Sequence, residues 1–272
     1  MMLEQKLNEA SEYIKSRIPQ KIKTAIVLGS GLGKITDQVE SPVEISYSDI
    51  PHFFQTTVKG HSGKLIAGKL GEASIFFLSG RIHLYEGHDI QDVVFPVRLM
   101  KTLGVENILL TNASGGVNEQ FAPGELCLIE DQINLTGTNP LIGKNHDFLG
   151  ERFPDMSDLY SKELREMILS SAIELDLKLH RGIYAGVLGP SYETPSEVKM
   201  IQRLGGDLVG MSTVFEAIAS HHSGMNVAGI SCVTNMAAGI LEEKLRHDDI
   251  KEKADQAFGT FSKLIKAFVA KL

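Results

Sequence analysis

The sequence is poor in cysteine, and its two cysteines do not form a redox or zinc motif. Cys127 and Cys232 both lie inside apolar stretches, and neither belongs to a C-x-x-C pair. The pattern predicts buried free thiols in a reducing cytoplasm. The sequence also lacks any run that approaches about 18 uninterrupted apolar residues, the length typical of a membrane-spanning helix. We therefore expect a soluble, cytoplasmic protein that is not bound to a membrane.

Basic residues are in the minority. The 272 residues include 27 lysines and arginines against 34 aspartates and glutamates, which gives a formal net charge of -7 at pH 7. This balance argues against an extended basic surface that follows a nucleic-acid backbone, so we expect no nucleic-acid partner. A local cluster of hydrogen-bond donors can nevertheless bind a small anion in an acidic protein.

Internal repeats, low-complexity segments and linkers are also missing, which favours a single domain over residues 1–272. Short β-branched and apolar runs alternate with amphipathic helical patterns, and this alternation predicts the α/β class with a mixed central β-sheet flanked by helices. Strands are expected at 24–28, 64–70, 74–79, 107–111, 125–130, 182–189, 207–211 and 226–234. Helices are expected near the N-terminus up to Pro19 and at 92–103, 161–176, 196–204, 213–223 and 248–272.

One segment has no sustained period. Residues 134–160 carry Phe148, Phe153, Met156 and Tyr160 but fit neither a helix nor a strand. Loops of this length in a compact domain are usually functional, and these aromatic and apolar side chains could contact a ligand or a neighbouring subunit. The alternative is a compact loop that packs on its own side chains.

The stretch T-A-I-V-L-G-S-G-L-G, residues 24–33, predicts a strand followed by a glycine-rich turn. The dinucleotide fingerprint G-x-G-x-x-G fails because Lys34 stands in place of the third glycine. The triphosphate loop fails because Ile35 stands where a hydroxyl must hold magnesium. The remaining functional interpretation is a site for one compact anion, held by backbone N–H groups and the hydroxyl of Ser30. A turn that only joins a strand to a helix is the alternative.

The stretch G-R-I-H-L-Y-E-G-H, residues 80–88, directly follows a predicted strand. If the chain stays extended, Arg81, His83 and Tyr85 alternate onto one face. A guanidinium binds a tetrahedral oxyanion through two hydrogen bonds and an imidazole adds a third, although a solvated strand end is the alternative. Neither His83 and His88 nor the adjacent His221 and His222 have a carboxylate at the H-E-x-x-H offsets, so we expect no metal.

Two further strand ends carry groups that suit an anion. T-N-A-S-G-G, residues 111–116, supplies backbone N–H groups near Ala113. V-G-M-S-T, residues 209–213, brings Ser212 or Thr213 to the start of a predicted helix, where backbone N–H groups attract anions. Either hydroxyl could instead serve only as a helix N-cap.

Two polar residues stand where burial would be costly without a partner. Glu193 lies in G-P-S-Y-E-T-P after a predicted strand, and Asn235 ends the apolar run G-I-S-C-V-T. A buried asparagine is more often a structural hydrogen-bonding residue. Its combination with several anion-binding motifs makes Asn235 a candidate for ligand recognition.

Taken together, the motifs resemble those of the trimeric purine nucleoside phosphorylases. They follow that family's order over nearly the whole chain: G-S-G-L-G, G-H-S-G-K-L, G-R-I-H-L-Y-E-G, N-A-S-G-G, R-F-P-D-M-S-D, G-P-S-Y-E-T, G-M-S-T and T-N. The resemblance implies a nucleoside phosphorylase-like fold and a pentosyltransferase of purine salvage. This enzyme would cleave purine (2'-deoxy)ribonucleosides with inorganic phosphate, giving free base and (deoxy)ribose 1-phosphate, without a metal or an organic cofactor.

The resemblance also implies a role for each matching residue. The expected phosphate-binding residues are Ser30, His61, Arg81, His83, Ala113 through its backbone, and Ser212. The expected nucleoside-binding residues are Tyr85, Tyr192, Glu193, Met211, Asn235, His247 and Phe153. Of these, Phe153 would reach the site of a neighbouring subunit in a homotrimer. The expected catalytic residues are Asn235, His83 and Glu193.

The pair of Glu193 and Asn235 predicts which purines are used. Guanine and hypoxanthine present an N1–H donor that a carboxylate accepts, whereas adenine presents a lone pair, so guanosine and inosine are the expected substrates. The related methylthioadenosine phosphorylases would carry an aspartate at position 235, which makes that activity the first alternative. A non-catalytic purine-binding protein is a second alternative, and a dinucleotide-dependent oxidoreductase is a third.

Overall fold

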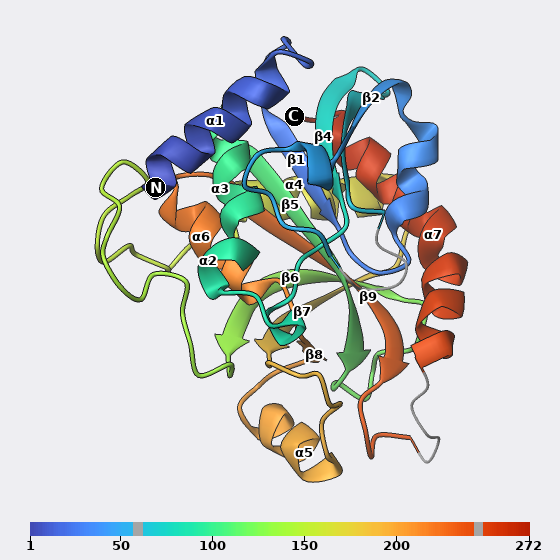
Figure 1. The fold of residues 1–272 in the computed structure, drawn as a ribbon. Coiled ribbons are helices and arrows are strands. Elements are labelled where there is room, and N and C mark those ends of the chain that lie inside the picture. Colours follow the sequence, from blue (N-terminus) through green and yellow to red (C-terminus); the bar gives the residue numbers. More distant parts are fainter. Residues whose placement is uncertain (57–61, 242–246) are drawn as a thin grey trace.

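The computed structural model describes residues 1–56, 62–241 and 247–272, with the backbone alone at 247–252 (Figure 1). In chain order its helices and strands are α1 Leu3–Lys15, β1 Thr24–Leu28, η1 Gly33–Gln38, β2 Glu40–Ser46, η2 Tyr47–Asp49, β3 Lys64–Leu70, β4 Ala73–Ser79, η3 Leu84–Glu86, α2 Ile90–Val93, α3 Phe95–Thr102, β5 Asn107–Gly116, β6 Leu126–Asn134, α4 Lys162–Glu174, β7 Leu179–Gly186, α5 Pro195–Arg203, β8 Leu208–Gly210, α6 Val214–His222, β9 Asn226–Met236 and α7 His247–Val269; η marks a 3-10 helix.

Nine strands of the described chain form one mixed sheet. Their order is β2-β3-β4-β1-β5-β8-β7-β6-β9, and β5 also pairs in parallel with β9. Strands β5, β8, β7, β6 and β9 therefore form a closed ring, from which β1, β4, β3 and β2 extend. Strand β1 is parallel to both of its neighbours, whereas β2, β3 and β4 pair antiparallel. The predicted α/β class with a mixed central sheet is confirmed.

Strand β1 shows why a continuous apolar run marks a buried strand in this fold. All five of its residues are buried, and successive side chains point to opposite faces of the sheet. Ala25 and Val27 pack in a core shared with α1, α3 and α6, whereas Ile26 and Leu28 pack in a second core shared with α4 and α7. Figure 1 shows α1, α3 and α6 on one side of the sheet and α7 on the other.

The eight predicted strands are all present, β1 and β3 with the predicted bounds and the other six with shifted ends, but β2 was not predicted. This strand lies at the edge of the sheet and is largely exposed, so it has no apolar run to reveal it. It contains Pro42, a residue that sheets tolerate at their edges. The predicted helix at 92–103 is divided at Val94 into α2 and α3, with Pro96 in the first turn of α3. Helix α1 ends at Lys15 and not at Pro19.

The long segment before α4 is irregular, as predicted. Two histidines at the end of α6 hold it in place: Nε2 of His221 donates to the carbonyl of Asp155 at 2.8 Å, and Nε2 of His222 donates to the carbonyl of Glu151 at 3.0 Å. These adjacent histidines therefore fix the loop on the body of the protein.

The two cysteines and the helices can each be compared with what the sequence predicts. Cys127 and Cys232 are buried and free, and burial raises the pKa of both thiols, that of Cys232 to about 12. None of the helices in the described part of the chain is both long and apolar enough to cross a membrane.

Gly29 directly follows β1 and lies against the backbone of β5. Its N–H donates to Oγ1 of Thr111 at 3.1 Å. A Cβ at position 29 would lie 2.5 Å from Cα of Asn112 and 2.8 Å from the carbonyl oxygen of Thr111. Both atoms belong to the backbone, so no side chain fits between the two strands.

We expect Gly29→Ala to lower the free energy of unfolding by about 1–3 kcal/mol, because overpacking against backbone forces the strands apart. Gly33→Ala is the matched control in the same turn, since its nearest atom would lie at 3.8 Å. Chemical denaturation of the two variants measures the difference. Equal unfolding midpoints would contradict this account of the turn.

Candidate active site

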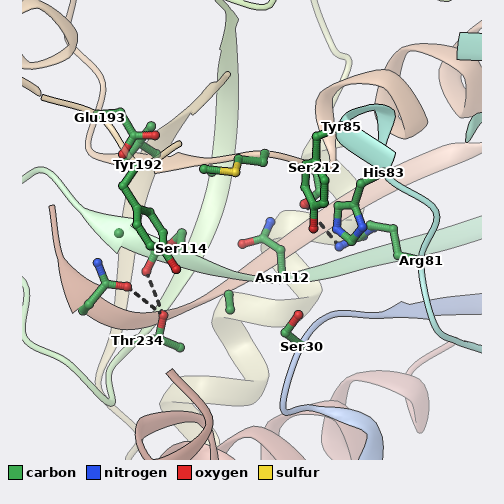
Figure 2. Close-up of a pocket in the computed structure, with 16 residues that line it drawn as sticks. Ser30, Arg81, His83, Tyr85, Asn112, Ser114, Tyr192, Glu193, Ser212 and Thr234 are labelled. Carbon is green, nitrogen blue, oxygen red and sulfur yellow. Dashed lines mark hydrogen bonds between the residues drawn. The ribbon is translucent and has the colours of Figure 1, made fainter. Parts of the chain in front are cut away.

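A cavity of about 130 Å³ lies where the segments after β1, β4, β7 and β8 meet the last residues of β5 and β9. The crevice outside the ends of such strands is where α/β sheets bind ligands. In Figure 2, Tyr192 and Glu193 lie at one end of this cavity, and Arg81 and His83 lie at the other. The two ends differ in chemistry, with a guanidinium at one and a carboxyl group at the other.

Arg81 is held rigidly at the cationic end. Its side chain is almost fully buried, and Nε donates to Oε1 of Glu216 at 2.7 Å. Nη1 lies 3.0 Å from the carbonyl oxygen of Thr111 and 3.3 Å from Oγ of Ser212. Because a guanidinium stays charged and presents its N–H groups in a fixed plane, this end suits a tetrahedral oxyanion.

The chain after Arg81 does not stay extended, which corrects the sequence-based expectation. Strand β4 ends at Ser79, and η3 follows three residues after Arg81. The cause is Glu86, whose Oε1 accepts the backbone N–H of His83 at 2.8 Å and lies 3.3 Å from its Nδ1. The turn stacks His83 on Tyr85, with ring centroids 4.7 Å apart. Both rings still line the cavity beside Arg81.

Three small residues complete the cationic end. Ser30 lies in the turn after β1, Ala113 lies in β5, and Ser212 directly precedes the N-cap of α6. The N-cap is Thr213, so the hydroxyl of Ser212 is not used as the cap and faces the cavity. Of the two residues considered from the sequence, Thr213 is therefore the N-cap residue and Ser212 lines the cavity.

The opposite end of the cavity carries Glu193 and Asn235. Burial raises the pKa of the Glu193 carboxyl, and the negative charge of Glu197 raises it further. The amide of Asn235 is oriented by its neighbours: Oγ1 of Thr234 donates to Oδ1 at 3.1 Å, and Nδ2 donates to the carbonyl of Met236 at 3.2 Å. This end therefore presents a carboxyl acceptor and an amide with a defined direction.

Ten of the thirteen predicted site residues line this one cavity: Ser30, Arg81, His83, Tyr85, Ala113, Tyr192, Glu193, Met211, Ser212 and Asn235. His61 lies outside the described residues. His247 begins α7, but its side chain is not described. Phe153 is 86% exposed and does not line the cavity, so its role toward a neighbouring subunit stays a prediction.

Sequence reasoning missed several residues of the site. Asn112, Ser114 and Thr234 line the cavity, although each lies inside a motif that was recognised. Behind the lining, Glu216 binds both Nε of Arg81 and the backbone N–H of Thr213 at the start of α6. Thr213 was considered from the sequence, but Glu216 was not. Their T-x-x-E order is the signature of a capping box and was the available signal.

Comparison with known proteins agrees with this geometry. The family model described as "Phosphorylase superfamily" matches residues 23–270. The chain is 48% identical to purine nucleoside phosphorylase 1 of Geobacillus stearothermophilus, covering 97% of this chain and 96% of that protein. It is 47% identical to purine nucleoside phosphorylase 1 of Bacillus subtilis, covering 98% and 99%.

A solved structure of a Schistosoma purine nucleoside phosphorylase in complex with hypoxanthine matches with a TM-score of 0.93 and 34% identity, covering 98% of this chain and 97% of that one. The Schistosoma mansoni enzyme in complex with adenosine gives a TM-score of 0.94, also at 34% identity. Fold and cavity thus define an enzyme of the nucleoside phosphorylase class, a pentosyltransferase. The chain belongs to the phosphorylase superfamily and, within it, to the purine nucleoside phosphorylases.

If Glu193 contacts the purine, as the sequence predicts, its raised pKa determines how nucleoside binding depends on pH. The charged carboxylate accepts the N1–H of a 6-oxopurine more strongly than the neutral acid does, and a raised pKa means that the charged form is lost at a higher pH than for an ordinary glutamate. We expect the affinity for inosine, measured by calorimetry without phosphate, to fall as the pH is lowered through this pKa. Glu193→Gln should bind inosine more weakly, and its affinity should not fall as the pH is lowered. An identical pH dependence in both proteins would contradict the assignment.

Proposed function

We propose that the protein cleaves the N-glycosidic bond of guanosine, inosine and their 2'-deoxy forms with inorganic phosphate. The observation that carries the proposal is the pairing of two ends in one cavity. Arg81 and His83 provide an anion-binding end, and Glu193 and Asn235 provide an end that matches a 6-oxopurine. The products would be the free base and the 1-phosphate of ribose or 2-deoxyribose.

At the cationic end, phosphate would act as both nucleophile and electrostatic catalyst. Breaking a glycosidic bond develops positive charge on the sugar, which a phosphate held beneath C1' stabilises and then attacks. Arg81, His83 and the hydroxyls of Ser30 and Ser212 supply donors of the type that phosphate requires. Phosphate is thus a co-substrate, and this chemistry requires neither a metal nor an organic cofactor.

At the other end, Asn235 would stabilise the departing base. The purine leaves with negative charge spread over N7 and O6, and an amide can accept from a protonated N7 while it donates to O6. Thr234 supports this orientation, because its hydroxyl donates to Oδ1 of Asn235. Tyr192 would stack on the base, while Tyr85 and Met211 would contact the ribose.

Glu193 and Asn235 also favour 6-oxopurines over adenine. The carboxylate of Glu193 accepts from the N1–H of guanine and hypoxanthine, a donor that adenine lacks. The amide nitrogen of Asn235 donates to O6, which in adenine is replaced by an amino group. The related Schistosoma mansoni enzyme was crystallised with adenosine, so adenosine is the comparison substrate for this chain.

The first test is a direct assay of phosphorolysis. We expect inosine and guanosine to release free base only when phosphate is present, with adenosine cleaved less efficiently. A steady-state comparison of the three nucleosides with and without phosphate measures this. Purified protein that releases no hypoxanthine from inosine in phosphate buffer would refute the proposal, and binding without conversion would favour a non-catalytic purine-binding protein.

A second test concerns Asn235. Removing one donor to a developing oxyanion costs about 10²- to 10³-fold in turnover, so Asn235→Ala should lower kcat by this order while the Kd for inosine changes little. Steady-state kinetics and calorimetry on the same preparation separate the two quantities. A loss confined to Kd would assign Asn235 to ground-state binding alone.

We further propose a cytoplasmic homotrimer in which Phe153 completes the cavity of a neighbouring subunit. Its 86% exposure on an otherwise ordered loop supports this role, because a large apolar side chain gains from being covered. We expect sedimentation to show a trimer and Phe153→Ala to raise the KM for inosine more than that for phosphate. A monomer with full activity would contradict the proposal.

A further inference from the structure

Glu216 connects two parts of the cationic end that come from different segments of the chain. Its Oε1 accepts from Nε of Arg81 at 2.7 Å, and its Oε2 accepts from the backbone N–H of Thr213 at 2.9 Å. Both side chains of the ion pair are nearly fully buried. One carboxylate therefore fixes the guanidinium and, at the same time, the backbone that precedes α6.

The backbone at Thr213 is strained. This residue has φ +73° and ψ -51°, a region that β-branched residues rarely adopt, and it is completely buried. The N–H of Val214 donates to the carbonyl of Ser212 at 2.8 Å, so residues 212–214 form a γ-turn. Such a conformation persists only where the surroundings enforce it, and it often occurs at functional sites.

Two groups enforce the turn. Glu216 holds the N–H of Thr213, and Nδ2 of Asn112 donates to its Oγ1 at 2.8 Å. Asn112 is fixed in turn, because the hydroxyl of Ser231 donates to its Oδ1 at 2.6 Å. The turn therefore has one support from its own helix and one from β5. These two supports fix the position of Ser212, which lines the cavity beside Arg81.

We infer that Glu216 is a positioning residue for phosphate: it sets both the guanidinium of Arg81 and the hydroxyl of Ser212 in the geometry that binds the co-substrate. This inference rests on the proposed phosphorolysis and adds a residue that does not touch the ligand. A misplacement of about 1 Å can cost about 10²-fold in rate. In metal sites, loss of a group that orients a ligand costs about 10- to 100-fold, and we expect a loss of the same order here.

Two other roles for Glu216 make different predictions. As a charge partner only, Glu216 would be replaceable by aspartate, and Glu216→Gln would bind phosphate more tightly because a negative charge is removed. As a helix cap only, Glu216 would affect stability and leave phosphate binding unchanged. Positioning predicts that both variants bind phosphate more weakly, since a shorter or a neutral side chain cannot hold Arg81 and Thr213 together.

The chain contains a matched control for the capping role. Helix α5 begins with the same T-x-x-E order, in which Oε2 of Glu197 accepts the N–H of Thr194 at 2.7 Å. Thr194 has an ordinary extended φ of -72°. Glu197→Asp and Glu197→Gln therefore disturb a capping box without the γ-turn, and they should leave phosphate binding unchanged.

The experiment measures the Kd of inorganic phosphate by calorimetry, the KM values for phosphate and inosine, and the melting temperature. For Glu216→Asp and Glu216→Gln we expect the Kd and KM for phosphate to rise about 10- to 100-fold, with a much smaller change in the KM for inosine. A phosphate Kd equal to that of the wild type in the aspartate variant, or a lower Kd in the glutamine variant, would overturn the inference.

A second pair of variants covers the case in which the Glu216 variants do not fold. Thr213→Gly accommodates the positive φ but removes the hydroxyl that Asn112 binds, whereas Thr213→Ser keeps that hydroxyl. We expect weaker phosphate binding in the glycine variant and nearly normal binding in the serine variant; equal affinities would overturn the inference. If the wild-type protein neither binds phosphate nor cleaves inosine, the proposed function is refuted together with this inference. If the wild type is active and the variants bind phosphate with the same affinity as the wild type, only the positioning role is refuted.

Discussion

The buried ion pair between Arg81 and Glu216 is the interaction on which the cationic end of the cavity depends. Removing two charges from water costs several kcal/mol per ion, and the cost is offset only when the remaining polar groups are satisfied. Here the carbonyl of Thr111 accepts from the guanidinium, and the second carboxylate oxygen accepts from Thr213. The partners are 135 positions apart in sequence, so the pair forms only when the end of β4 and the start of α6 have been brought together.

The closed part of the sheet supplies that juxtaposition. Strand β5 pairs with β9 along one edge, and its other edge pairs with β1 at residues 107–110 and with β8 at Gly115 and Gly116, so three segments that line the cavity border the same strand. Close approach at this centre depends on glycine: a Cβ at Gly29 would meet the backbone of β5, and one at Gly210 would lie 2.3 Å from the Tyr184 hydroxyl. Small residues thus allow the strands to approach closely, and polar side chains near the strand ends line the cavity.

How far the sequence predicts this arrangement depends on the kind of interaction. Buried strands such as β1 were predictable because both faces are apolar, whereas β2 was not, because its exposed residues carry no pattern. Ten site residues were predicted because they lie in motifs at or near strand ends, and because those motifs resemble the ones of a known family. The turn at His83 was missed because the Glu86 carboxylate, not periodicity, bends the chain. Glu216 was missed because it lies in an apolar helix, and its partner is distant in sequence.

The proposed binding of phosphate would require little reorganisation of the cavity. Of the groups that contact Arg81, Glu216 and the carbonyl of Thr111 lie behind the cavity as fixed anchors, while the 3.3 Å contact to Ser212 involves a hydroxyl that can rotate. An incoming oxyanion can therefore replace the weakest contact and leave the anchors in place. Donors that keep their position when charge arrives are the main source of electrostatic catalysis. The strain at Thr213 has the same consequence, because a backbone held by packing and hydrogen bonds keeps Ser212 aimed before the ligand enters.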